Sequence, residues 1–289
     1  MEINSLRLLL AFFAGIFLTS SGSLSQNTTQ NSLASPSTLG FDAMAVFAVL
    51  VSHGLLTLFN LNIELTHFSF LIFNACFLLT FLCLKGISLK SAQLDMKIII
   101  LIGLGFNLFI GAIFSVVQFL FIATNTKFPT GLWFGSFKFY QAIELLPFIC
   151  VFLLLIIFLY KNLSSLRLIS IGIPFAKGVG VEVAKTQRRS LFVAYYLTGV
   201  VICYFGVFSF ISLVFPHILR LLPFIKSDMR KEFTIGALIG GLIMMLLDFL
   251  VYNFDFYGAE LPVGMISSVL GSFMLISLLG RNYFKSLQK

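Results

Sequence analysis

Apolar residues in this chain fall into long runs separated by short polar stretches. The runs carry almost no charge, and most approach the length of about 20 residues that a membrane-crossing helix needs. They lack the strict alternation of apolar and polar positions that a transmembrane β-barrel requires. The pattern predicts one all-α domain over residues 1–289, with about nine spans and a tight reversal at Gly206. The expected spans are roughly 8–25, 42–60, 67–84, 98–122, 143–160, 190–205, 207–222, 233–252 and 263–280.

Composition and charge placement support a membrane bundle. Hydrophobic residues make up 59% of the chain and charged residues 10%, against about 25% charged in soluble domains. The net charge of +8 would suit nucleic-acid binding, but the basic residues cluster in alternate connections. If residue 1 lies outside, these connections face the cytoplasm. Every Lys and Arg except Arg7, Lys127 and Lys138 then lies on the cytoplasmic side, as the positive-inside rule requires. We therefore expect an outer N-terminus, a cytoplasmic C-terminus and no nucleic-acid partner.

Two hydrophilic stretches interrupt the apolar pattern. Residues 26–40 carry many Asn, Ser and Thr residues and no charge, which favours a segment that packs into protein or lines a water-filled path. Residues 161–189 are basic and amphipathic, and breaks at Pro174, Gly178 and Gly180 predict two short helices at the inner surface. This second stretch is either a solvated basic loop or a docking element for a cytoplasmic partner. The chain has no Walker A motif, so we expect it to have no ATPase activity of that type.

Asp248 is the polar residue that most needs an explanation, because it lies within an apolar run. An intramembrane carboxylate costs on the order of 2.5–3.5 kcal/mol on insertion scales, so it should face the bundle interior or a polar neighbour. A proton relay is the alternative. His53, His67 and the four cysteines lack the spacing of metal ligands, and we expect them to pack within the bundle without a bound metal or cofactor.

Further polar and small residues mark helix ends and contacts. His217 and Arg220 follow Pro216 near an inner helix end, where positive side chains favour helix carbonyls. Glu260, Pro262 and Gly264 form an outer helix start, because Pro and a carboxylate both favour the first turn. The spacing of Gly residues at 236, 240 and 241, and at 103, 105 and 111, predicts close helix packing.

The order of these features resembles the FecCD-type permeases of ABC importers for iron–siderophore, haem and vitamin B12. Near the N-terminus, the segment from Arg7 to Gly40 matches the second helix and inner loop of that family without a gap. The resemblance continues in the Trp-x-x-Gly-Ser-type element at 133–137, in the coupling segment with Gly172, Ala176 and Gly180, and in residues 206–281.

The resemblance implies roles for individual residues. Asn31 and Leu33 would belong to the cytoplasmic gate, and the helices at 172–181 would seat in the cleft of an ATPase subunit. Pro216, His217 and Arg220 would lie near the same side, whereas Arg7 would receive a lobe of a substrate-binding protein at the outer rim. The residues assigned to structure or to the path are Asp248, Glu260, Pro262 and Gly264.

The chain departs from the family pattern at several positions. Asn4 and Leu6 replace the first Arg and the Pro of the opening motif, and Ser32 replaces a gate Pro. Ile173 replaces the coupling Glu, and Tyr252 replaces a basic residue of some members. The family has ten spans, and this chain begins where the second should start. The resemblance thus implies either a start codon placed too late or a shortened member that lacks the first helix.

The expected protein is a non-enzymatic permease subunit of a bacterial inner-membrane importer for an iron chelate, with haem or cobalamin as further candidates. Its expected partners are the lipid bilayer, a cytoplasmic ATPase subunit that uses ATP, an identical or different second permease subunit, and an extracytoplasmic binding protein. One alternative is an ion-coupled secondary transporter that uses Asp248 and Glu144. Another is a membrane scaffold that moves nothing.

Overall fold

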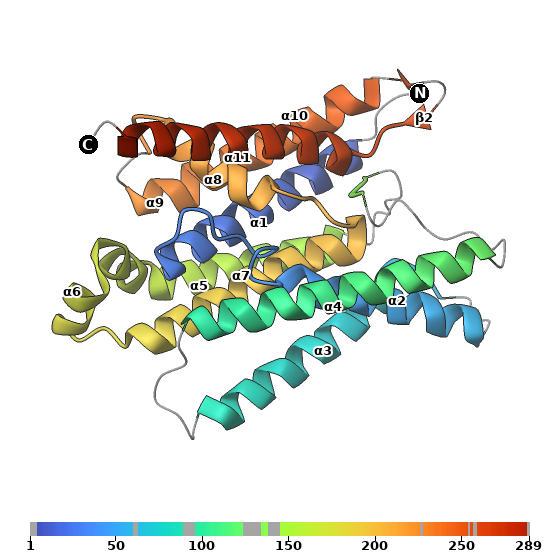
Figure 1. Cartoon of the computed structure of the whole chain (residues 1–289), viewed down its shortest axis with the longest axis horizontal. Coiled ribbons are helices and arrows are strands. Elements are labelled where there is room, and N and C mark those ends of the chain that lie inside the picture. Colours follow the sequence, from blue (N-terminus) through green and yellow to red (C-terminus); the bar gives the residue numbers. More distant parts are fainter. Residues whose placement is uncertain are drawn as a thin grey trace.

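The computed structural model is a bundle of helices (Figure 1). It describes residues 5–59, 63–88, 96–123, 134–137, 145–225, 228–253, 255–256 and 259–287. The helices are α1 (Ser5–Thr29), α2 (Phe41–Leu58), α3 (Leu65–Ser88), α4 (Met96–Ala123), α5 (Leu145–Ile171), α6 (Ile173–Gly178), α7 (Val183–Phe205), α8 (Ile211–Leu221), α9 (Met229–Lys231), the π-helical turn η3 (Glu232–Gly236), α10 (Ala237–Asn253) and α11 (Val263–Leu287). Strands β1 (Asp255–Phe256) and β2 (Ala259–Glu260) pair antiparallel before α11.

The predicted helical fold class is confirmed, since each expected span coincides with a described helix. Within the described ranges, three helical stretches are long and apolar enough to cross a membrane: α1, α5 and the continuous stretch Met229–Asn253. Five shorter apolar helical segments fall in α2, α3, α4, α8 and α11. The number of spans and the orientation of the termini stay predictions.

Helix α1 lies at the centre of the bundle, where it packs against α10, α7, α8 and α5. Its crossing with α10 depends on small residues. A Cβ on Gly15 would lie 2.6 Å from the Gly240 carbonyl oxygen, and a Cβ on Gly241 would lie 2.7 Å from the Phe12 ring. The predicted close packing is thus confirmed at Gly240 and Gly241, whereas Gly105 and Gly111 face open space.

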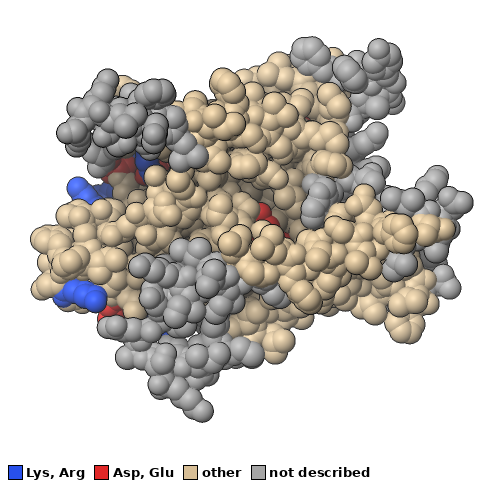
Figure 2. Space-filling model, viewed as in Figure 1, with Lys and Arg blue, Asp and Glu red and all other residues tan. Residues whose placement is uncertain are grey.

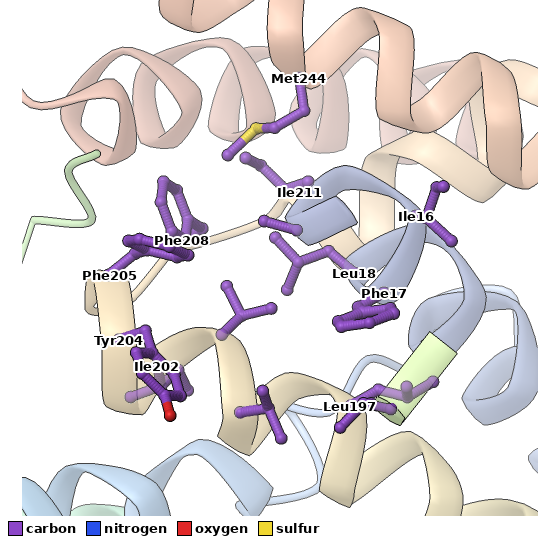
Figure 3. Packing of buried hydrophobic residues seen from close by; sticks show 14 of the residues in the cluster. Ile16, Phe17, Leu18, Leu197, Ile202, Tyr204, Phe205, Phe208, Ile211 and Met244 are labelled. Atoms are coloured by element: carbon purple, nitrogen blue, oxygen red, sulfur yellow. The ribbon is translucent and has the colours of Figure 1, made fainter. Parts of the chain in front are cut away.

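A continuous apolar core fills the space around α1. Phe17 stacks on Phe148 of α5 at 5.5 Å, and Phe137 stacks on Phe208 at 5.2 Å. Figure 3 shows side chains of α1, α7, α8 and α10 converging on this core, together with Phe208 from the connection between α7 and α8. The core therefore holds together segments that lie far apart in the sequence.

The predicted boundaries of both hydrophilic stretches need correction. Helix α1 continues to Thr29, so the first connection begins at Gln30, and α5 continues through Lys161 to Ile171. One short surface helix, α6, replaces the expected two, because α7 already begins at Val183. Polar side chains at 161–170 ended the apolar run but not the helix, since no Gly or Pro interrupts the backbone before Gly172.

The bundle has two distinct ends. At one end, which we call the α6 end, α6 and α9 lie together with the last turns of α1 and α11 (Figure 1). At the other, which we call the β end, α1 starts and β2 lies. On the face drawn in Figure 2, the visible Lys and Arg side chains gather at the α6 end. The charged and polar groups of the candidate site are concentrated there.

Candidate functional site

The connection between α1 and α2, residues 30–40, contains the predicted gate residues Asn31 and Leu33, and we call it the gate segment. Gln30 adopts φ 51° at the end of α1, and the Asn31 side-chain oxygen accepts a hydrogen bond of 3.0 Å from the Leu33 amide. This Asx-type turn fixes the local path of the chain. Asn31 is exposed and Leu33 is half-buried, so both lie at a surface where a path could be opened or closed.

The gate segment is held against α4 by direct backbone contact. Gly40 has φ +78°, and a Cβ on either Gly40 or Gly103 would overlap the backbone of the other segment. The Asn107 amide also donates a 3.3 Å hydrogen bond to the Ser37 carbonyl. Glycine is required at this junction because only a residue without Cβ permits both the positive φ and the close approach.

Two glutamines tie the end of α1 to the helices that flank α6. Gln30 Nε2 donates a 2.7 Å hydrogen bond to the Ile169 carbonyl in the last turn of α5. Gln187 Nε2, in the first turns of α7, donates a 2.8 Å bond to the Thr28 carbonyl. The end of α1 is thus bonded directly to both helices that flank α6. Neither contact could be predicted from the sequence, because the partners lie 139 and 159 residues apart.

Helix α6 presents one apolar face inward and another outward. Ala176 is fully buried in a small cluster with Ile169 and Val183. Phe175 and Val179 are 51% and 59% exposed on the other side. Gly172 precedes α6, and Gly180 lies in the turn that follows it. Helix α6 and the turn after it therefore expose two apolar side chains at this end of the bundle.

A buried polar cluster links α8, η3 and α1 at the same end. The Arg220 guanidinium binds both carboxylate oxygens of Glu232, with Nε–Oε2 at 3.1 Å, and donates a 2.6 Å bond to Gln26 Oε1. Gln26 in turn donates to the Leu213 carbonyl at 3.1 Å. Glu232 lies in the π-helical turn η3, and such turns often occur at functional sites. Glu232 was not predicted, because nothing in the sequence identifies its partner.

Pro216 and His217 lie one turn before Arg220 on α8. Pro216 is buried where α1 and α8 meet, with its Cγ 3.0 Å from the position of a Cβ on Gly22. His217 is half-buried. These residues therefore belong to the α1–α8 contact at the α6 end.

At the β end the structure places Arg7 differently from the docking residue expected above. Its side chain is only 6% exposed, and it forms a bidentate ion pair with Asp248 in which Nε–Oδ2 and Nη2–Oδ1 are both 2.8 Å. The Tyr252 ring lies 4.9 Å from the guanidinium carbon. Arg7 in this state is enclosed by the bundle, so contact with an outer partner would require this pair to open.

The start of α11 lies in a tight junction of three segments. Helix α11 begins at Val263, directly after Pro262, and the Gly264 amide donates a 2.9 Å hydrogen bond to the Gly135 carbonyl. The Ser136 amide donates to the Phe205 carbonyl at 2.8 Å. Glu260 lies in β2. Glu144, Lys127 and Lys138 lie outside the described residues.

The contacts at the α6 end fix the positions of α1, α5, α7, α8 and η3 relative to one another. The described ranges hold no group of three or more His, Cys, Asp or Glu residues that could hold a metal ion. The long apolar helices and the polar α6 end together are typical of an integral membrane protein.

Solved structures share this fold. The chain superimposes on a transporter assigned to the metal-chelate type of ABC transporters, in an inward-facing conformation, with a TM-score of 0.76 and 23% identity; the match covers 95% of this chain and 85% of that one. PsaBC from Streptococcus pneumoniae, solved with a Fab, gives a TM-score of 0.55 at 16% identity over 94% and 89% of the two chains. Both likenesses establish the fold.

The chain belongs to the FecCD transport family, which matches residues 1–281. It is 29% identical to the ferric enterobactin permease protein FepG of Escherichia coli, covering 94% of this chain and 79% of FepG. It is 27% identical to the iron(3+)-hydroxamate permease protein FhuG of Bacillus subtilis, covering 96% and 82%. The vitamin B12 permease protein BtuC of Yersinia enterocolitica is 29% identical over 95% and 79%.

Proposed function

We propose that this chain is the permease subunit of a binding-protein-dependent ABC importer that moves an iron chelate of the siderophore type. Haem and cobalamin are further candidate ligands. The observation that carries the proposal is the family match over residues 1–281, which includes relatives named for ferric enterobactin, iron(3+)-hydroxamate and vitamin B12 transport.

The proposed mechanism is alternating access driven from the α6 end. An ATPase subunit would receive α6 in a cleft, with the exposed Phe175 and Val179 as contacts and the buried Ala176 as the anchor to this chain. ATP binding and hydrolysis by that subunit would displace α6. The bonds from Gln30 and Gln187 would carry the displacement to Asn31 and Leu33. The polar cluster of Arg220 would make α8 and η3 move together with α1. Pro216 and His217 lie beside this cluster.

We place the protein in the bacterial inner membrane, with about nine spans, an outer N-terminus and a cytoplasmic C-terminus. The basic residues support this orientation, since those at the α6 end would face the cytoplasm. The functional assembly would contain two permease subunits, identical or paired, two ATPase subunits and an extracytoplasmic binding protein. This chain would bind no cofactor, and the ATPase partner would use the ATP.

The ion-coupled alternative is disfavoured by the surroundings of Asp248. A carboxylate that carries protons must become neutral during the cycle. In this structure both carboxylate oxygens of Asp248 accept hydrogen bonds from Arg7 instead. We therefore assign Asp248 a structural role, and we assign Gly264 and Pro262 to the junction that positions α11.

The test is co-purification from the native host after gentle extraction. We expect mass spectrometry to find a nucleotide-binding subunit with the intact chain, and much less of it with a Phe175→Asp/Val179→Asp variant. A Leu58→Asp variant, which alters an exposed apolar residue on another helix, serves as control. Recovery of no ATPase subunit from the wild type, even after crosslinking, would overturn the proposal.

A further inference from the structure

A basic pocket of about 500 Å³ lies between the last part of α5 and the first turns of α7. Four basic residues line it: Lys161 from α5, and Lys185, Arg188 and Arg189 from α7. No carboxylate is among its described lining residues. Its volume lies within the range of small-molecule sites, and none of the roles proposed above uses it.

The concentration of positive charge calls for an anionic occupant. Glu182 forms a 2.7 Å ion pair with Lys185, and its pKa is lowered by that hydrogen bond and by the charge of Lys185. Glu182 thus offsets part of the positive charge around the pocket. Like charges gathered in one concavity raise the local concentration of anions, and a phosphate group suits a site built from Lys and Arg.

The pocket is also apolar on the side away from the α6 end. Phe158 precedes Lys161 by one turn on α5, and Phe192 follows Arg188 and Arg189 by one turn on α7. Because α5 runs toward the α6 end and α7 runs away from it, both helices place their basic residues nearer that end and their Phe residues deeper in the bundle. An occupant that matches both halves has an anionic head and a hydrocarbon part.

An exposed apolar stripe of α5 leads into the pocket. Leu154 and Ile157 are 58% and 51% exposed, and Lys161 follows them on the same face of the helix at i+7 and i+4. Only 17% of the most apolar window of α5 is buried in the chain. This face would lie against lipid acyl chains. The pocket would then lie at the depth where the acyl chains end and the headgroups begin.

We propose that this pocket binds an anionic phospholipid, with the phosphate among Lys161, Arg188 and Arg189 and the acyl chains along Phe158, Phe192 and the exposed stripe of α5. The proposal rests on the membrane location that forms part of the proposed function. A bound lipid would fill the groove between α5 and α7, the two helices that carry α6. Lipid composition would then affect how firmly α6 is held.

To test this proposal, the purified full-length chain is reconstituted in phosphatidylcholine bilayers. One sample contains spin-labelled phosphatidylglycerol, and the other contains spin-labelled phosphatidylcholine. The immobilised fraction of each label is measured by electron paramagnetic resonance. We expect the wild type to immobilise phosphatidylglycerol about fivefold more strongly, since one basic residue near an anionic lipid contributes on that order. The Lys161→Gln/Arg189→Gln variant should lose this preference, and the Lys161→Arg/Arg189→Lys variant should retain it.

The matched control is Arg167→Gln/Arg230→Gln, which removes two exposed charges at the same end but outside the pocket. It should leave the preference unchanged. Equal effects of the two Gln variants, or none from either, would overturn the proposal. So would displacement of the label by millimolar inorganic phosphate, because the site would then take free phosphate. Loss of the ATPase subunit from the pocket variant with lipid preference intact would assign the surface to that protein instead.

These outcomes are separable from a failure of the proposed transport. Lipid preference is measured on the chain alone, without ligand, ATP or partner. A chain that moves no iron chelate but selects phosphatidylglycerol through Lys161 and Arg189 would leave this inference standing.

Discussion

At the scale of single residues, Arg7 and Asp248 show how a bundle can contain charge deep inside. Each satisfies the other with two hydrogen bonds of 2.8 Å, and the Tyr252 ring covers the guanidinium. The family pattern has a basic residue in some members where this chain has Tyr252. Here the ring contributes a cation–π contact to the Arg on α1, so the substitution leaves the cation partnered.

Removing one member of this pair should destabilise the protein strongly. We expect Arg7→Met or Asp248→Leu to lower stability by about 3–5 kcal/mol, because each leaves an uncompensated buried charge. The double variant Arg7→Met/Asp248→Leu should recover most of that loss. Thermal unfolding in detergent measures all three. Additive losses in the double variant would show that the two side chains do not act as a pair.

Glycine contacts give a second residue-scale prediction. Gly15→Ala should destabilise by about 1–3 kcal/mol, because the new methyl group would overlap the Gly240 carbonyl and Met244. Gly111→Ala is the matched control, since a Cβ there meets nothing within 4 Å. The same unfolding assay separates them. Similar effects of both substitutions would mean that α1 and α10 pack less closely than described.

At the scale of elements, helix positions could be predicted from the sequence, whereas their lateral partners could not. Apolar runs located the spans because lipid and core both select apolar residues. The end of α5 was placed eleven residues too early, at 160 instead of Ile171, since a drop in hydropathy at Lys161 does not stop a helix. The bonds of Gln30, Gln187 and Glu232 join segments distant in sequence, so no local pattern encodes them.

The two glutamine bonds predict a separation of ATP hydrolysis from transport. In the assembled complex, Gln30→Ala/Gln187→Ala should leave ATPase activity near the wild-type rate but lower ligand uptake per ATP several-fold. Each bond contributes only about 1 kcal/mol, so the fold should survive. Uptake of a radiolabelled ferric chelate and phosphate release are measured on the same vesicles.

Asn253→Ala is the control for that experiment, because Asn253 bonds only to its own helix, at the Phe249 carbonyl, among the contacts described. It should change neither quantity. Unchanged coupling in the glutamine variant would remove these bonds from the proposed mechanism and leave the Arg220 cluster as the connection to test next.

At the scale of the whole molecule, the sequence and the structure both place basic residues at one end of the bundle, the α6 end. On the face drawn in Figure 2, the visible Lys and Arg side chains lie at the end that also holds α6 and the last turn of α1, where the gate segment begins. The sequence predicted this grouping through the positive-inside rule. It did not predict the ion pair at the β end, because Arg7 and Asp248 are 241 residues apart.

Orientation can be measured directly. In a variant without native cysteines, a single Lys177→Cys substitution on α6 should react with a membrane-impermeant maleimide in inverted vesicles but not in intact spheroplasts. The exposed Lys177 is accessible to the reagent from its own side. Labelling in spheroplasts would reverse the assigned topology and move the gate segment to the outer face.

The π-helical turn η3 also has a consequence for helical phase. Glu232 and Asp248 are sixteen residues apart, so in an uninterrupted α-helix their side chains would point about 160° apart. A single π-turn removes about one residue of rotation, or roughly 100°, and leaves the two carboxylates about 60° apart. Both side chains can therefore contact α1. Asp248 binds Arg7, and Glu232 accepts a hydrogen bond from Asn27. Deleting one residue within η3 and restoring a regular α-helix would leave the two carboxylates fifteen residues apart, at the same angle of about 60°. The bulge therefore accommodates one extra residue in this stretch without turning either carboxylate away from α1.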